Sequence, residues 1–227
     1  STTSQSLQAG FHLLADQETI NALRRNGIEV FDLLTVFRKA RTHSQAMQDE
    51  LYLSQDTHWA PKGIQVVAQA LAQDLLQRGI VTVGNVEYRL KSIPLQRYGD
   101  VLTMMNIPLY TRFYAPETLQ CDQVVIGDTE DPYRDDPVSP ILIIGDSFLR
   151  IFERDDPQSA GFISHLAYEL KQPLASIVSD GGASTIVRQE LAHKSELLKN
   201  KKLVIWEFVD RDIRFGTEGW QKVTLRG

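Results

Sequence analysis

The chain of 227 residues is poor in the features that mark several large classes of protein. It has one cysteine, Cys121, which excludes an intrachain disulfide framework and fits either a cytoplasmic or a bacterial periplasmic protein. No apolar run reaches the roughly 18–20 residues that a membrane span needs, and no signal peptide is visible. The formal net charge of −5 leaves no basic field for nucleic acid.

The remaining composition is that of an ordinary globular protein. Hydrophobic residues make up 42% of the chain and charged residues 23%. This length suits one α/β domain better than two small ones. Because the chain runs abruptly from Ser1–Ser6 into a helical pattern, we expect a single domain over residues 1–227 that is truncated at its N-terminus.

The second half of the chain has the clearer pattern. Predicted strands at residues 141–144, 173–178 and 203–208 alternate with predicted helices at 162–170 and 184–198. This alternation predicts a parallel central sheet with right-handed crossovers. Ligands of such sheets lie beyond the carboxyl ends of the strands, so the loops that follow the three strands are expected to form one binding edge.

The first half is less regular. A helix is predicted over residues 17–26 and a strand over residues 28–33. Pro61 suits the first position of a helix, and an apolar stripe follows it as far as Gly79. Residues 81–133 mix short β-like pieces with many turn residues, which predicts irregular connections that shape a substrate site.

One serine lies where a nucleophile would be presented. Gly145-Asp146-Ser147 directly follows the apolar strand Ile141–Ile144 and precedes a predicted helical turn. A serine there can expose its hydroxyl while nearby backbone N–H groups face a developing oxyanion. The alternative is that Ser147 only caps the helix, a role that serine also favours.

A histidine with a neighbouring carboxylate supplies the base that such a serine needs. Asp56 and His58 share a short loop before a helix, so the carboxylate can accept the Nδ1–H and leave Nε2 for the serine. Asp-x-His alone would favour a turn aspartate beside a solvated histidine, but its occurrence with Gly-Asp-Ser favours catalysis. The other histidines have no such context and are expected on the surface or in helices: His12, His43, His165 and His193.

A metal centre is the weaker alternative. Asp56, His58 and Asp146 could supply ligands, but no second histidine lies at ligand spacing. We therefore expect neither a metal nor another cofactor.

Several other residues are candidates for binding. Gly181-Gly182, between a strand and a helix, lets backbone N–H groups approach a ligand, although a plain helix-entry turn explains it equally well. Arg150 and Arg211 could bind a carboxylate, or pair with acidic neighbours such as Glu153 and Glu207. Gly99-Asp100 is best explained as a plain turn. Aromatic rings that could stack on sugars, or simply fill the core, are Trp59, Tyr98, Tyr110, Tyr114 and Trp206.

These motifs resemble a known group. Gly145-Asp146-Ser147 with Asp56-x-His58 looks like an SGNH-hydrolase site, but ordinary SGNH enzymes carry the serine block first. The reversed order is similar to the alginate O-acetyltransferase family of the AlgJ/AlgX type, and the resemblance covers about residues 28–215. The peripheral motifs that share it are Tyr98–Val101, Gly181–Ser184, Trp206–Phe208 and Arg211.

The resemblance implies a three-layer SGNH-like domain with permuted catalytic blocks. It also implies a periplasmic protein that acetylates an exopolysaccharide such as alginate. A segment outside this chain could anchor that protein to the inner membrane. Ser147 would be the acetylated nucleophile, His58 the base and then the acid, and Asp56 its orienting partner. The Ser147 N–H and the Gly181-Gly182 turn would face the oxyanion.

The partners follow from the same resemblance. The acceptor would be a polysaccharide, and a membrane-bound partner would deliver the acetyl group, because nothing in the sequence resembles an acyl-CoA site. An esterase or deacetylase with the same triad, and a non-catalytic polysaccharide-binding scaffold, are the alternatives.

Overall fold

The computed structural model describes residues 17–43, 51–127, 129–215 and 220–224. Residues 1–34 and 35–227 form two compact units, and each is described by itself. Among the described residues, no helix is both long and apolar enough to cross a bilayer. The predicted single domain over residues 1–227 stays a prediction.

In the first unit, residues 17–25 are helical, close to the predicted bounds of 17–26. The prediction of a strand at residues 28–33 is wrong, because residues 28–32 have no regular structure. The side chain of Asp32 accepts the N–H of Leu34 at 3.0 Å, in the manner of a helix cap. Helix α2 (Leu33–His43) begins there.

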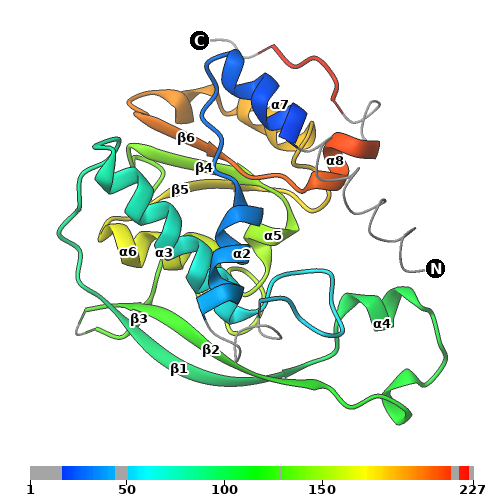
Figure 1. Cartoon of the computed structure of the whole chain (residues 1–227). Helices are drawn as coiled ribbons and strands as arrows, with labels where there is room; N and C mark the ends of the chain where they lie inside the picture. Colours follow the sequence, from blue (N-terminus) through cyan, green and yellow to red (C-terminus); the bar gives the residue numbers. More distant parts are fainter. Residues whose placement is uncertain (1–16, 44–50, 128, 216–219, 225–227) are drawn as a thin grey trace. The chain divides into compact units, whose positions relative to one another are not determined.

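The second unit contains two three-stranded sheets, in the orders β5-β4-β6 and β1-β2-β3 (Figure 1). Its elements after α2 are, in chain order, α3 (Pro61–Gln77), β1 (Tyr88–Arg97), α4 (Asp100–Met104), η2 (Tyr110–Arg112), β2 (Glu117–Ile126), β3 (Asp131–Pro132), β4 (Ile141–Gly145), α5 (Ser147–Arg150), α6 (Phe162–Leu170), β5 (Ala175–Val178), α7 (Ile186–His193), η3 (Ser195–Leu198), β6 (Leu203–Trp206) and α8 (Asp210–Phe215).

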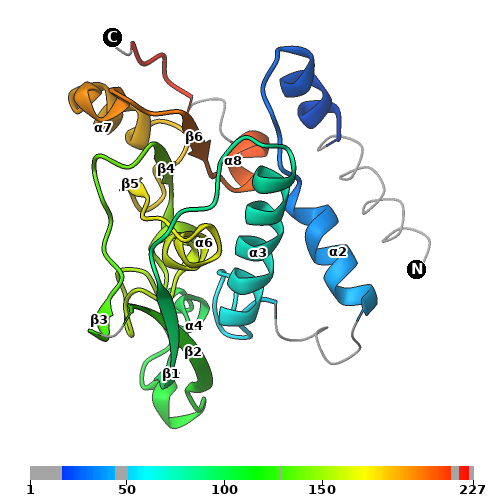
Figure 2. The same cartoon turned by 90° about the vertical axis from the view of Figure 1, so that its left-hand side faces the viewer.

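The parallel sheet predicted from the second half of the chain is confirmed, with β4 between β5 and β6. Helix α7 covers one face of this sheet, while α6 and α3 lie on the other (Figures 1 and 2). The face toward α7 is packed by Leu142 and Ile144 of β4 against Val187 and Leu191. Because side chains alternate along a strand, the buried Ile143 points to the opposite face.

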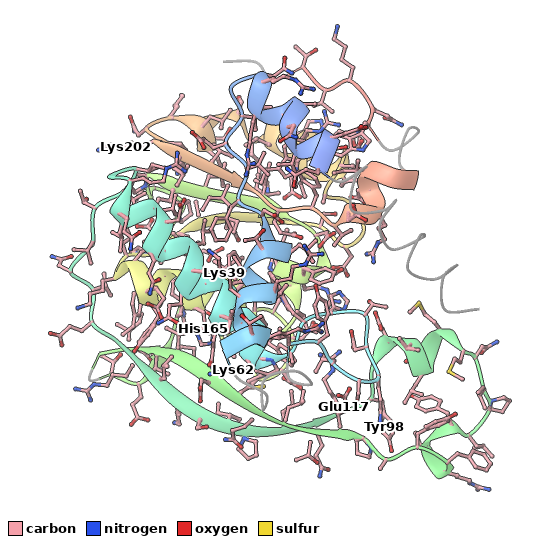
Figure 3. The ribbon with its side chains drawn as sticks, in the orientation of Figure 1. Lys39, Lys62, Tyr98, Glu117, His165 and Lys202 are labelled. Atoms are coloured by element: carbon pink, nitrogen blue, oxygen red, sulfur yellow. The ribbon has the colours of Figure 1, made fainter. Side chains whose placement is uncertain are left out.

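Helices α3 and α6 lie where they are predicted, whereas α2, α4 and α8 are not predicted. Helix α3 occupies the expected span after Pro61, and the turn that follows it uses Gly79 at φ +67°. The helix predicted at residues 184–198 is interrupted at Lys194, which separates α7 from η3. His165, expected on the surface or in a helix, lies in α6 but is 3% exposed (Figure 3).

Residues 81–133 contain regular structure that the sequence does not predict. Strands β1 and β2 form an antiparallel ladder from Tyr88–Ile126 to Arg97–Glu117 (Figure 1). Residues 89–92 of β1 are exposed on both faces, and burial alternates only from Ile93 to Arg97, so the strand lacks a continuous alternation. Its position at the sheet edge tolerates Pro94, which donates no ladder hydrogen bond.

One carboxyl group of the fold should make stability depend on pH. Glu153 Oε2 accepts the N–H and the hydroxyl of Ser164 in the first turn of α6, at 3.0 and 2.9 Å. Burial raises the pKa of Glu153 to about 8, although the bonds from Ser164 oppose this shift. The folded chain therefore holds this proton more tightly than the unfolded chain, and stability decreases as pH rises from about 4.5 to about 8.

We predict that Glu153→Gln weakens this pH dependence by roughly 1–3 kcal/mol, because the amide cannot ionise. The measurement is the free energy of unfolding in urea at pH 5 and pH 8.5. Glu196→Gln, at an exposed position in η3, is the control. An unchanged pH dependence in Glu153→Gln would contradict the assignment.

Candidate active site

The serine predicted as nucleophile lies at the junction of β4 and α5. β4 ends at Gly145 and α5 begins at Ser147. The cap of α5 is Asp146, whose Oδ1 accepts the N–H of Phe148 at 2.9 Å. The hydroxyl of Ser147 is thus not used to cap its own helix.

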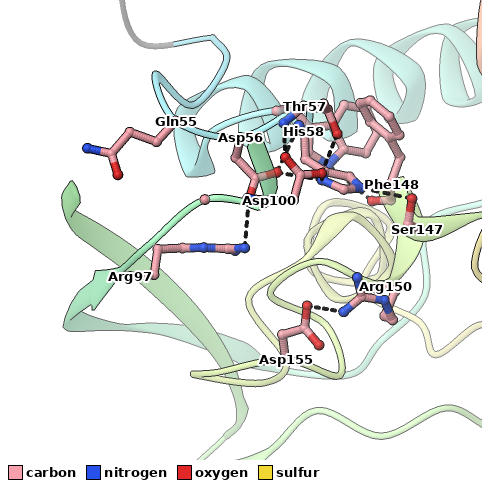
Figure 4. A network of polar contacts seen from close by, with 12 residues as sticks. Gln55, Asp56, Thr57, His58, Arg97, Asp100, Ser147, Phe148, Arg150 and Asp155 are labelled. Atoms are coloured by element: carbon pink, nitrogen blue, oxygen red, sulfur yellow. Dashed lines mark hydrogen bonds and ion pairs between the residues drawn. The ribbon is translucent and has the colours of Figure 1, made fainter. Parts of the chain in front are cut away.

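The structure brings Ser147, His58 and Asp56 into one hydrogen-bonded line (Figure 4). Nε2 of His58 lies 2.8 Å from Oγ of Ser147, and Nδ1 lies 2.6 Å from Oδ1 of Asp56. The three residues are 6–8% exposed. In this geometry the carboxylate selects the tautomer whose Nε2 can take the serine proton.

Three further donors hold the carboxylate of Asp56, and the first is the backbone N–H of His58, which donates to Oδ1 at 3.1 Å. Arg97 donates to Oδ2 at 2.8 Å and the backbone N–H of Asp100 donates to the same oxygen at 3.1 Å. Burial raises the pKa of Asp56, but the hydrogen bonds from His58 and Asp100 and the charge of Arg97 outweigh it and lower the pKa to about 2. Asp56 therefore stays ionised beside His58 near neutral pH.

Asp100 is a second acidic group of the site, which the prediction of a plain turn missed. Its Oδ1 accepts the N–H of Thr57 at 2.8 Å, and its Oδ2 accepts the Thr57 hydroxyl at 2.6 Å. Oδ2 is also 3.6 Å from Nδ1 of His58. Gly99 allows this approach, since a Cβ there would lie 1.8 Å from the carbonyl oxygen of Gln55. The feature of the sequence that could have pointed to the role of Asp100 was the Gly99-Asp100 pair itself.

Glu117, at the start of β2, anchors the other end of the same loop (Figure 3). Its Oε1 accepts the N–H and the hydroxyl of Ser54, both at 2.8 Å, and its Oε2 accepts the N–H of Gln55 at 3.0 Å. More than sixty positions separate these partners in the chain, so no local pattern could reveal the contact.

Trp59 joins the catalytic loop to the nucleophile turn instead of offering a face to a sugar. Its ring is 1% exposed and packs edge-on against Phe148, with ring centroids 5.4 Å apart. The indole N–H donates to the carbonyl oxygen of Phe148 at 3.1 Å. Tyr98 is half-buried and packs edge-on against Tyr110, with ring centroids 5.4 Å apart.

The predicted arginines differ in their surroundings. Arg150 donates to Asp180 at 2.6 Å and also binds Asp155, so its guanidinium is paired within the protein, and not with Glu153 (Figure 4). Arg211 is exposed in α8.

The glycine pair lies at the edge of a cavity of about 360 Å³. The N–H of Gly182 donates to the carbonyl oxygen of Ser179 at 3.1 Å, so it is not free to face an oxyanion. Gly181 is exposed and has φ +61°. The cavity lining is mostly neutral and polar, and comprises Gly181, Gly182, Ser184, Thr185, Ile186, Gln189 and Gln221.

Two further properties of the site bear on its chemistry. Within the described part of the chain, the N–H of Ser147 donates to no acceptor, which leaves it available to an oxyanion. Ligand atoms of Asp56, His58 and Asp100 converge within 4.8 Å. These atoms are already hydrogen-bonded: His58 bonds Asp56, Arg97 donates to Asp56, and Thr57 donates to Asp100. A metal ion would have to replace those bonds.

The chain and its fold have clear relatives. Residues 4–210 match the family model described as "SGNH hydrolase-like domain, acetyltransferase AlgX". The chain belongs to this family. It therefore has an SGNH hydrolase-like fold of the AlgJ/AlgX family, which includes the parallel sheet described above.

Individual relatives agree. The chain is 25% identical over 197 residues to "Probable alginate O-acetylase AlgJ" of Azotobacter vinelandii, which covers 82% of this chain and 47% of that protein. It is 26% identical over 211 residues to the Pseudomonas syringae pv. tomato protein of the same name, covering 89% and 51%. The chain thus spans about half the length of these relatives.

Solved structures share the fold. The O-acetyltransferase domain of Pseudomonas putida AlgJ superposes with a TM-score of 0.68 at 21% identity, covering 87% of this chain and 65% of that one. Pseudomonas aeruginosa AlgX superposes with a TM-score of 0.58 at 18% identity, covering 85% and 43%.

We predict that Asp56→Asn removes stability that this AlgJ/AlgX-family chain has only above the acid range. Because the pKa of Asp56 is about 2 when folded and 3.8 ordinarily, its contribution is present above pH 3.8 and is lost as pH falls toward 2. The variant should lose roughly 1–3 kcal/mol at pH 6.5 and almost nothing near pH 2.

Urea unfolding at both pH values measures this difference. Asp74→Asn is the control, since Asp74 pairs with Arg78 on an exposed helix surface. A loss in Asp56→Asn that is equal at both pH values would contradict the role of its charge.

We also predict that Glu117→Ala destabilises the chain by about 1–3 kcal/mol, because three donors of the catalytic loop lose their acceptor. Glu130→Ala, which removes an exposed ion pair with Lys91, should cost less than about 1 kcal/mol. Equal unfolding midpoints for the two variants would show that Glu117 does not hold the loop.

Proposed function

We propose that this chain is an acetyltransferase domain that moves acetyl groups to hydroxyls of a bacterial exopolysaccharide through an acetyl-Ser147 intermediate. The observation that carries the proposal is the hydrogen-bonded line from Asp56 through His58 to Ser147. The names of the AlgJ relatives, alginate O-acetylases, support alginate or a similar polymer as the acceptor. The proposed order of the catalytic blocks is permuted relative to ordinary SGNH enzymes.

In the first step, Oγ of Ser147 attacks the acetyl carbonyl while Nε2 of His58 takes the hydroxyl proton. The tetrahedral oxyanion faces the N–H of Ser147, with Gly181 as a candidate second donor. Collapse breaks the bond to the donor's leaving group, which receives the proton from His58. The product is acetyl-Ser147, and Asp56 stabilises the imidazolium throughout.

In the second step, a sugar hydroxyl of the acceptor takes the place of the leaving group. His58 accepts the proton of this hydroxyl while the hydroxyl oxygen attacks the acetyl-serine carbonyl. The bond between the acetyl carbon and Oγ of Ser147 then breaks, and His58 returns the proton to Oγ. The neutral cavity beside Gly181 and Gly182 suits the hydroxyls of a sugar unit, because its lining offers hydroxyl, amide and backbone groups.

The cellular setting follows from the same proposal. A domain spanning residues 1–227 of a longer periplasmic protein would receive acetyl groups from a membrane-bound partner. Water as the acceptor would make the same site an esterase or deacetylase, so the acceptor decides between the two activities.

We predict that the protein gains one acetyl mass on incubation with an activated acetyl ester, and that Ser147→Ala does not. Removing the nucleophile should lower ester turnover by at least about 10³-fold, since the intermediate cannot form. Intact-protein mass spectrometry measures the label, and Ser176→Ala, a serine away from the triad, is the control.

Product analysis with an oligosaccharide acceptor separates the alternatives. Acetylated sugar supports the transferase, and free acetate alone supports an esterase. Equal labelling of Ser147→Ala and wild type, or no labelling of wild type, would contradict the proposal and favour a non-catalytic scaffold.

A further inference from the structure

Glu207 lies at the end of β6, and its side chain reaches the turn that presents the serine. Its Oε2 accepts the backbone N–H of Asp146 at 3.1 Å. Its own N–H donates to the carbonyl oxygen of Ile144 at 2.8 Å, which continues the pairing of β6 with β4. The side chain of Glu207, which directly follows β6, thus bonds Asp146, the residue immediately before Ser147 at the end of the neighbouring strand β4.

The strand end leaves room for this carboxyl group because residue 145 is glycine. A Cβ at Gly145 would lie 2.4 Å from Oε2 of Glu207 and 3.0 Å from its Cβ. It would also lie 2.7 Å from Cδ1 of Leu149. The carboxyl group of Glu207 therefore lies in the space that a side chain at position 145 would fill. Any residue larger than glycine at 145 would displace this carboxyl group.

The bond from Glu207 completes the set of contacts that hold the turn. Asp146 is bonded through its N–H to Glu207 and through its side chain to the N–H of Phe148. The N–H groups on both sides of Ser147 in the chain are thereby occupied, while the N–H of Ser147 meets no acceptor among the described residues. The directions of the Ser147 N–H and hydroxyl depend on this frame, because a turn with fewer bonds could rotate.

We propose that Glu207 is a positioning residue, which acts through its hydrogen bond to Asp146 to hold Ser147 for attack. The proposal rests on the proposed function of Ser147 as the nucleophile. Glu207 does not contact the reacting atoms, so its effect is on the rate at which Ser147 reacts.

The bond to Asp146 does not require Glu207 to be ionised. Burial and the neighbouring charge of Asp146 raise the pKa of Glu207 well above its ordinary value, and the charge of Asp212 adds to this shift. In either protonation state the carboxyl group keeps an oxygen that can accept the Asp146 N–H.

The test compares Glu207→Ala, Glu207→Gln and wild type in the rate at which a fluorophosphonate probe modifies Ser147. This probe reacts with an activated serine whatever the natural donor and acceptor are. We expect Glu207→Ala to lower the maximal rate by about 10- to 100-fold, with the probe concentration at half-maximal rate changed less than about threefold. Glu207→Gln keeps a carbonyl acceptor and should stay within about threefold of wild type.

The control is Glu190→Ala, which removes an ion pair with Lys194 on the surface of α7 and should leave the rate unchanged. If Glu207→Ala does not fold, Gly145→Ala replaces it, because the added Cβ displaces the same carboxyl group. Its rate is then expected to fall about as far.

Three results would overturn the positioning role: an unchanged maximal rate in Glu207→Ala, a loss in Glu207→Gln as large as in Glu207→Ala, or an effect on probe affinity alone. A wild type that reacts with the probe but transfers no acetyl group refutes the proposed acetyl transfer and leaves the role of Glu207 measurable. A wild type that does not react with the probe refutes both.

Discussion

The site depends on keeping one buried carboxylate ionised beside His58. The side chain of Asp56 is fully covered, and an uncompensated charge there would take up a proton. His58 itself, Arg97 and the N–H of Asp100 supply the compensation, and the last two come from the end of β1 and the start of α4. Without them the carboxyl group would not hold the imidazole in the tautomer that faces Ser147.

The hairpin therefore acts as the support of the catalytic loop. Glu117 holds the first residues of the loop, Asp100 holds Thr57, and Arg97 holds Asp56, so the loop is bonded along its length by one substructure. The nucleophile belongs to the other substructure, the parallel sheet. Trp59 connects the two substructures through its hydrogen bond to Phe148. Where the substructures meet, Nε2 of His58 lies 2.8 Å from Oγ of Ser147.

The charged groups around the nucleophile are mostly paired within the protein. Arg150 is shared between Asp155 and Asp180, and the carboxyl group of Glu207 lies against Asp146. Such pairs order the loops at the carboxyl ends of the strands, but they leave these side chains few bonds for a substrate. The cavity beside Gly181 and Gly182, in contrast, is lined by neutral side chains and backbone.

The sequence by itself determined the parts whose signals are local. Gly145-Asp146-Ser147 after an apolar strand, Asp56-x-His58 before Pro61, and the apolar stripe of α3 each lie within a few residues, and they predicted the triad and the parallel sheet. Only the tertiary structure decided that Arg97, Asp100 and Glu117 hold the loop, because their partners lie 41–63 positions away. The polar edge strand β1, with Pro94, carries no continuous alternation from which its register with β2 could be predicted. Burial of Trp59 against Phe148 and the pairing of Arg150 with Asp180 were likewise decided by neighbours 89 and 30 positions away, since a side chain bonds whatever the fold places beside it.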